Sequence, residues 1–202
     1  MPRHPALALL EFDSVTAGIV AGDAMVKRAP ISALHTGTVQ PGHYLVLVAG
    51  EVADVEEAVD AGTSVSGDSI LDLVLLPDIH PDVVEALRGA RQDGEVEALG
   101  IVETISVASI IEAADAGVKG ASVRLLEMHV ADGLGGRGYL LFGGSVSDVE
   151  VAVDIGSERV HEGHLVRRAV ISQLHDEMRA NLEEHPRFGP SIGREGGGGA
   201  TG

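Results

Sequence analysis

The fold is decided by a repeated stretch, EFDSVTAGIVAGDAMVKRAPI (Glu11 to Ile31), which returns as ETISVASIIEAADAGVKGASV (Glu103 to Val123). Glu, Ser-Val, Asp-Ala, Val-Lys and Ala coincide in register at an offset of 92 residues. Further on, VADVEEAVDAG (Val52 to Gly62) matches VSDVEVAVDIG (Val146 to Gly156) at an offset of 94. Two copies are too few for a solenoid, so we predict a tandem duplication of a domain of roughly 85 to 90 residues.

The offset between the copies changes along the chain. Tyr44-Leu45 matches Tyr139-Leu140, and Ile79-His80 matches Leu174-His175, both at an offset of 95. These shifts predict small insertions in the loop before Tyr139 and near Gly50.

Each copy predicts a mixed α/β (α+β) domain with the order βαββαβ-α, which is typical of a ferredoxin-like sheet with an added helix. Ser14 and Ser106 are expected N-caps, because a serine oxygen accepts from the free N–H groups of a first helical turn. The expected elements of the first copy are strand Ala6 to Phe12, helix to about Lys27, strands Ile31 to Val39 and Tyr44 to Val48, helix Val52 to about Ser64, strand Ile70 to Leu76 and a helix from His80. Those of the second copy are strand Glu97 to Thr104, helix to about Lys119, strands Val123 to Val130 and Tyr139 to Gly143, helix Val146 to about Val160, strand Leu165 to Ser172 and a helix from His175.

These elements divide the chain into two domains and a tail. We expect copy 1 at residues 6–91 and copy 2 at residues 97–185, with a short polar linker at Gly89 to Gly94. Residues 186–202 end in Gly-Gly-Gly-Gly-Ala-Thr-Gly and lack apolar periodicity, so they predict a flexible tail.

Composition excludes several classes of function. The formal net charge of −17 repels polyphosphate, which argues against nucleic-acid partners. No apolar run approaches the ~20 residues needed to cross a membrane, and from Met1 to Pro5 we expect no signal peptide. The absence of cysteine excludes thiol nucleophiles and Cys-ligated zinc or iron–sulfur clusters. We therefore expect a cytoplasmic protein without membrane contact.

Several spaced motifs together resemble a known family. LGIVET at Leu99, AADAGVKGASV at Ala113, a glycine-containing hairpin and SDVEVAVDIG at Ser147 look like the shell-protein domain of bacterial microcompartments. Two unpermuted copies in one chain resemble the tandem-domain, trimer-forming class of that family. The resemblance implies a homotrimer that forms a flat pseudo-hexameric tile. Such tiles join hexameric and pentameric shell proteins in a polyhedral shell around encapsulated enzymes, and small metabolites pass through a central pore.

The same resemblance places the two hairpin tips at the pore. The implied pore-lining residues are Gln40, Pro41, Gly42, His43, Gly133, Leu134, Gly135, Gly136 and Arg137. Because the two loops differ in length and chemistry, we expect three-fold rather than six-fold symmetry. Some tandem relatives hold an iron–sulfur cluster on a Cys-Pro-Gly turn; this chain has Gln40 in place of that cysteine, so we expect no cofactor.

The tile edge is likewise implied by the resemblance. Its expected residues are Lys27, Lys119, Asp78, His80, Gln173 and His175. The lysines lie at equivalent helix ends, where the helix dipole also favours a solvated cation. The two histidines precede short helices, where an imidazole ring can cap or pack.

No catalytic or metal motif stands beside these residues. Gly133 to Gly138 satisfies G-x-G-x-x-G, but a strand follows it rather than the helix that a dinucleotide site needs. His161-Glu162-Gly163-His164 lacks the helical spacing of H-E-x-x-H. No nucleophile, base and orienting group fall together. We predict a structural protein rather than an enzyme; the alternative is a ferredoxin-like small-molecule-binding sensor or regulatory protein.

Overall fold

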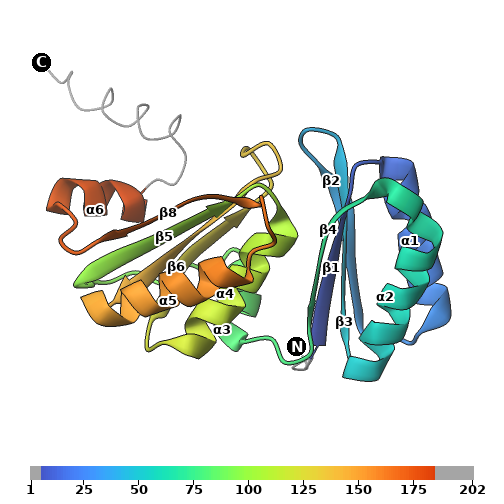
Figure 1. The fold of residues 1–202 in the computed structure, drawn as a ribbon, viewed down its shortest axis with the longest axis horizontal. Helices are drawn as coiled ribbons and strands as arrows, with labels where there is room; N and C mark the ends of the chain where they lie inside the picture. Colours follow the sequence, from blue (N-terminus) through green and yellow to red (C-terminus); the bar gives the residue numbers. More distant parts are fainter. Residues whose placement is uncertain (1–5, 185–202) are drawn as a thin grey trace, which may run out of the picture.

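The computed structural model describes residues 6–184 and contains two α/β units, each built on a four-stranded sheet (Figure 1). The predicted tail at residues 186–202 lies outside the described residues. The first unit contains β1 (Ala6–Phe12), α1 (Val15–Arg28), β2 (Ala33–Val39), β3 (His43–Gly50), α2 (Val52–Ser66), a 3-10 turn (Gly67–Ser69), β4 (Ile70–Leu76) and α3 (Pro81–Leu87). The second contains β5 (Ala98–Thr104), α4 (Val107–Gly120), β6 (Arg124–Val130), β7 (Gly138–Gly144), α5 (Val146–Arg159), β8 (Leu165–Ile171) and α6 (Asp176–Glu184).

The two sheets have the same topology. Their strand orders are β2-β3-β1-β4 and β6-β7-β5-β8, and every neighbouring pair is antiparallel. This is the order of a ferredoxin-like sheet, so the predicted duplication and fold class are confirmed.

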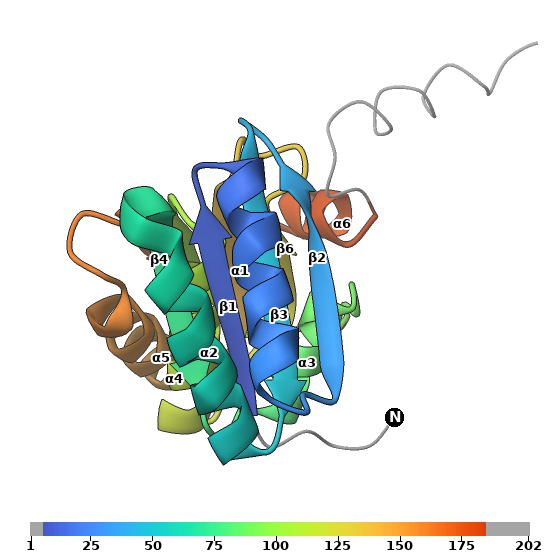
Figure 2. The same ribbon diagram turned by 90° about the vertical axis from the view of Figure 1, so that its right-hand side faces the viewer.

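Local chemistry sets the starts of α1 and α4 as predicted. Ser14 Oγ accepts from Ala17 N at 3.3 Å, and Ser106 Oγ accepts from Ser109 N at 3.2 Å. Each hydroxyl satisfies one of the N–H groups that the first helical turn leaves free. Both long helices of each unit then lie on one face of its sheet, as Figure 2 shows for α1 and α2 over the first sheet.

The sequence match of Tyr44 with Tyr139 is wrong in register. Glu11 pairs with Leu45 in the first sheet and its equivalent Glu103 pairs with Tyr139 in the second, so Leu45 corresponds to Tyr139 and Tyr44 to Gly138. Packing explains the difference. A side chain at Gly18 of α1 would collide with the Tyr44 ring, whereas in the second unit Ile110 of α4 fills the space left by Gly138. The large and the small residue have exchanged between helix and strand, which conserves core volume.

The insertions also differ in part from the prediction. The hairpin loop of the first unit has three residues, between Val39 and His43, and that of the second has five, between Ala131 and Arg137. The insertion predicted before Tyr139 is therefore present. The second insertion lies between α5 and β8 rather than near Gly50, because the offset stays at 94 from β3 through α2.

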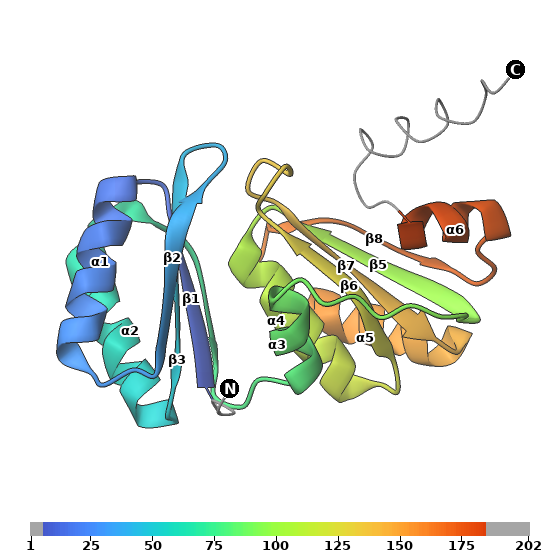
Figure 3. The same cartoon turned by 180° about the vertical axis from the view of Figure 1, so that it is seen from behind.

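The second unit covers the free face of the first sheet (Figures 1 and 3). Helix α4 packs across β1 and β4, and α3 packs against β6 and α4. One continuous apolar core therefore crosses the boundary between the units. From the first unit it contains Leu7, Leu9, Val74, Leu76, Ile79, Val83 and Ala86.

Within residues 6–184, no second α/β unit covers the corresponding face of the second sheet, although Leu99 and Leu141 in the middle of that face are buried. Strand β8 is largely exposed along its length, and α6 lies beside it with an exposed Met178. The two sheets therefore have the same architecture but different surroundings.

Candidate functional site

The two hairpin tips lie at the same end of the molecule and touch each other (Figure 3). A Cβ added at Gly136 would lie 2.9 Å from the carbonyl oxygen of Gln40 and 3.5 Å from Nδ1 of His43. The structure thus brings the two loops that the family resemblance places at a pore into one cluster.

The loops reach this contact with different backbones. In the first, Gly42 N donates to Val39 O at 3.0 Å and closes a tight turn around Gln40 and Pro41. In the second, Gly133, Gly135 and Gly136 all have left-handed φ values of 77°, 64° and 85°. Only glycine adopts such angles without cost, and at Gly136 the missing side chain also allows the loop to approach Gln40.

A glutamate of the neighbouring strand lies at the base of each hairpin and contacts a hairpin side chain. His43 Nδ1 lies 3.0 Å from Glu11 Oε1, while Arg137 Nη1 donates to Glu103 Oε1 at 3.2 Å. The Glu11 carboxylate is buried and also accepts from Val107 N, at the start of α4, at 2.9 Å. Burial raises the pKa of Glu11 above its ordinary value, although the bonds from Val107 and His43 oppose that rise.

The two expected edge lysines are not in equivalent surroundings. Lys27 pairs with Asp23 Oδ2 at 2.5 Å on the exposed face of α1. Lys119 pairs with Asp115 Oδ2 at 2.6 Å and also donates to the carbonyl of Asp78. Lys119 therefore ties α4 to the segment that follows β4, across the boundary between the units.

The remaining expected edge residues lie at helix starts. His80 Nδ1 accepts from Asp82 N at 3.2 Å and caps α3, and its backbone N–H donates to Asp115 Oδ1 at 2.8 Å. His175 Nδ1 accepts from Glu177 N at 3.3 Å in the same way. Gln173 is exposed beside His175. Both histidines thus have a capping role within the chain.

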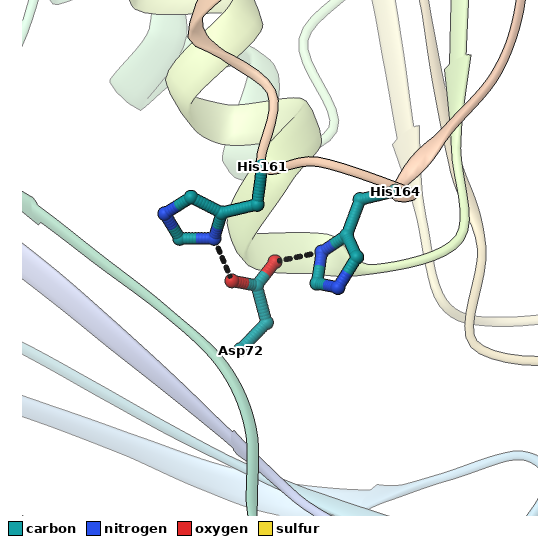
Figure 4. A group of neighbouring side chains, drawn as sticks. All are labelled: Asp72, His161 and His164. Atoms are coloured by element: carbon teal, nitrogen blue, oxygen red, sulfur yellow. Dashed lines mark hydrogen bonds and ion pairs between the residues drawn. The ribbon is translucent and has the colours of Figure 1, made fainter.

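The sequence analysis missed a polar cluster between the units (Figure 4). Asp72 of β4 is buried and receives the hydroxyls of Ser106 and Ser109 on Oδ2, the latter at 2.6 Å. His161 Nδ1 lies 2.6 Å from Oδ1, and His164 Nδ1 lies 3.1 Å from Oδ2. Burial alone would raise the pKa of Asp72, but these hydrogen bonds hold it below its ordinary value. One signal was visible: Asp72 interrupts an otherwise apolar strand, and a buried charge requires partners.

The sequence predicted neither a dinucleotide-binding turn nor a membrane-spanning helix. The G-x-G-x-x-G stretch leads into strand β7 rather than a helix, so it does not form a dinucleotide turn. Within residues 6–184, no helix combines the length and apolarity needed to cross a membrane.

Comparison with known proteins agrees with the fold. The family model of the BMC domain matches residues 6–79 and 98–174. Over 180 residues, the chain is 42% identical to the bacterial microcompartment shell protein PduT of Citrobacter freundii, covering 89% of this chain and 98% of PduT. A crystal structure of a microcompartment protein from Desulfitobacterium hafniense has a TM-score of 0.73 at 39% identity, covering 88% of this chain and 99% of that one.

A shorter relative shows what is duplicated. The shell protein PduA of Salmonella typhimurium is 33% identical over 93 residues, which are 45% of this chain but 99% of PduA. One copy here thus corresponds to a whole PduA. With the domain matched twice over most of its length, the chain belongs to the BMC-domain family of bacterial microcompartment shell proteins.

Proposed function

We propose that this chain is a structural tile of a microcompartment shell, and that three copies close into a ring of six alternating domains. The observation that supports the ring is the junction between the two units, in which the outer face of the first sheet packs against α4 of the second unit. The equivalent surfaces, on α1 and on the second sheet, have no partner of this kind within residues 6–184. A head-to-tail contact of this kind repeats between chains until it closes.

The first exposed surface is the outer stripe of α1. Val15 and Ile19 correspond to Val107 and Ile111 of α4, since the helices match at an offset of 92. Ile111 is 0% exposed and Val107 is buried against the first sheet, whereas Ile19 is 54% exposed and Val15 is also exposed. An apolar stripe with this exposure is ready to pack on the second sheet of a neighbouring chain.

The receiving surface is the exposed part of the outer face of the second sheet, along β8. Val83 of α3 is 0% exposed where α3 packs against β6 and α4, but its equivalent in α6, Met178, is 52% exposed. Glu103 is also in place to accept from Val15 N of the next chain, as Glu11 accepts from Val107 N within the chain. The two half-surfaces are therefore complementary in both apolar and polar groups.

The ring also explains the hairpin contact. The loops meet at one end of the internal junction, so repetition of that junction would bring all six loops around the ring axis. The opening would be lined by backbone groups, Gln40 and His43, with Arg137 behind them, and such groups select among small polar metabolites. A Cys-bound cluster does not fit, because the chain contains no cysteine.

Assembly provides the decisive test of the tile. Native mass spectrometry is expected to show a species of three times the 20.8-kDa chain mass, and electron microscopy is expected to show sheets or closed shells when other shell proteins are co-expressed. A stable monomer at micromolar concentration and moderate salt would overturn the proposal. The sensor alternative is not favoured, because the similar proteins are shell components, and we expect encapsulated enzymes rather than effectors as partners.

The pore position has a separate test. Gln40→Cys would repeat one thiol three times around the axis, and clustered thiolates bind soft metals and iron–sulfur clusters. After anaerobic reconstitution with iron and sulfide, this variant is expected to gain visible absorption that the matched control Ser64→Cys, on the exposed side of α2, does not gain. Equal iron uptake by the two variants would place the turn away from the axis.

A further inference from the structure

We propose that Asp72, His161 and His164 bind a divalent transition-metal ion, Zn²⁺, which joins the two units of the chain. Asp72 comes from β4 of the first unit, whereas both histidines come from the connection between α5 and β8 of the second (Figure 4). The ligand atoms of the three residues lie within 4.8 Å of one another. A single ion can therefore reach all of them with small side-chain adjustments.

Asp72 Oδ2 has three polar neighbours, which is more than its lone pairs can accept from. Oδ2 already accepts the hydroxyls of Ser106 and Ser109, and an ionised carboxylate offers about two lone-pair sites on each oxygen. His164 Nδ1 is a third group on this oxygen at 3.1 Å, and it also lies 3.1 Å from Ser109 Oγ. In the tautomer with the hydrogen on Nε2, the Nδ1 lone pair faces these oxygen atoms, and a cation bound by all of them would satisfy it.

The local charge also favours a cation. Asp72 pairs directly with Glu11 across strands β4 and β1, and both carboxyl groups are buried. Like charges at such a position are destabilising unless they are neutralised; His43 lies 3.0 Å from Glu11, so Asp72 is the carboxylate that a cation would neutralise. The equivalent pair of the second sheet is Glu103 with Arg167, where the charges already balance. The excess of negative charge is therefore specific to the junction that contains the two histidines.

The donor set identifies the ion. Two imidazole nitrogens and one carboxylate oxygen suit Zn²⁺ and similar transition metals, and are a poor match for Ca²⁺ or Mg²⁺, which prefer oxygen ligands. The serine hydroxyls orient the carboxylate in the way that outer partners orient metal ligands. The His161 side chain is 54% exposed, so an ion can enter from solvent and keep a water molecule as a further ligand.

The rival explanation is a purely hydrogen-bonded cluster, in which the Nδ1–H groups of the histidines donate to the Asp72 carboxylate and no metal binds. The two explanations differ in metal stoichiometry. Since all ligands come from one chain, the result does not depend on whether the trimer forms.

Metal binding can be measured on the tag-free, chelator-treated full chain with Zn²⁺ alone, by isothermal titration calorimetry. We expect one Zn²⁺ per chain, at least tenfold weaker binding in Ser109→Ala, and loss of the site in His161→Ala and in His161→Ala/His164→Ala. The control is His35→Ala, which removes an exposed histidine of β2 away from the cluster. Co²⁺ in place of Zn²⁺ is expected to give visible absorption bands that disappear in the same variants.

Thermal unfolding gives a second readout. Zn²⁺ at about a hundred times its dissociation constant is expected to raise the Tm of the parent by roughly 5 to 10 °C and to leave the double variant unchanged. Absence of Zn²⁺ binding by the parent, or equal binding by the parent and the folded double variant, would overturn the proposal. Because His161 is largely exposed, its replacement keeps the test valid even where the double variant folds poorly.

Discussion

Ile19→Asp is expected to dissociate the ring while leaving each chain folded. The side chain of Ile19 is 54% exposed on α1, and its equivalent Ile111 is fully buried between the two units. If the junction between chains copies the junction within the chain, Ile19 enters the same kind of apolar site on the second sheet of the next chain. A carboxylate there would face apolar groups without a partner.

The size of the effect follows from the area still exposed. Full burial of an isoleucine side chain contributes about 1.5 to 3 kcal/mol, and roughly half of Ile19 remains to be buried, which is about 1 kcal/mol per junction. Three junctions make about 3 kcal/mol, so Ile19→Ala is expected to weaken trimer formation by roughly a hundredfold. Ile19→Asp adds the desolvation of an unpaired charge, several kcal/mol at each junction, and is expected to abolish the trimer at micromolar concentration.

Sedimentation equilibrium of the two variants measures this directly, with circular dichroism to show that the chain stays folded. The matched control is Val65→Asp on α2, whose side chain is 50% exposed. Its equivalent, Arg159, remains exposed beside the junction already formed within the chain, so Val65 is expected to stay outside the junction between chains. An Ile19→Asp protein that sediments as a trimer with the parent's affinity would refute the reasoning, and so would a Val65→Asp protein that dissociates equally.

Three further predictions concern charge. Lys27→Glu is expected to leave trimers intact but to block sheet formation, as judged by electron microscopy. Lys119 is left unchanged in this test, because it also holds the junction inside the chain. Arg167→Asp is expected to weaken the trimer in sedimentation, and adding Asp68→Arg is expected to restore part of the loss. The reason is that Asp68 lies in the loop of the first unit that corresponds to the loop carrying His161 and His164 in the second. Normal trimers in the Arg167→Asp variant would contradict this pairing. Burial raises the pKa of Glu11, so its stabilising contribution is present below the unfolded pKa and is lost as pH rises through the folded pKa. Relative to the parent, Glu11→Gln is therefore expected to gain stability in urea unfolding as the pH rises above about 4, with Glu103→Gln as control; an equal pH response of the parent and Glu11→Gln would contradict it.

The helices and their starts were accessible from sequence because their signals are local. Ser14 and Ser106 precede apolar, alanine-rich stretches and cap the helices where expected. The duplication was also accessible, since motif spacing survives small insertions. The positions of the residues expected at the pore and the tile edge stay predictions, because they depend on chains that a single copy does not contain.

Strand register was less accessible because it depends on packing between distant residues. The tyrosines at 44 and 139 look equivalent in sequence, yet Tyr44 occupies the space beside Gly18 whereas Tyr139 donates to Glu127 Oε1 at 2.6 Å. A one-residue shift moves a strand residue to the opposite face of its sheet. The true register becomes clear from the packing: Tyr44 lies against Gly18 in the first unit, and Ile110 lies against Gly138 in the second. This exchange can be recognised only when the pairing of the strands is already known.

The comparison of the two sheets suggests why duplication matters for this chain. In a ring of identical single domains every junction must carry the same charges. Here the internal junction carries Asp72 against two histidines, whereas the equivalent position at the free end carries Arg167. The two junctions therefore carry charges of opposite sign at equivalent positions. If a first unit docked where a second unit belongs, its charges would not match those of its neighbour, and mispaired rings would be disfavoured. In the proposed ring, the duplicated chain would thus fix the alternation of the two hairpins, and with it the expected three-fold symmetry of the opening.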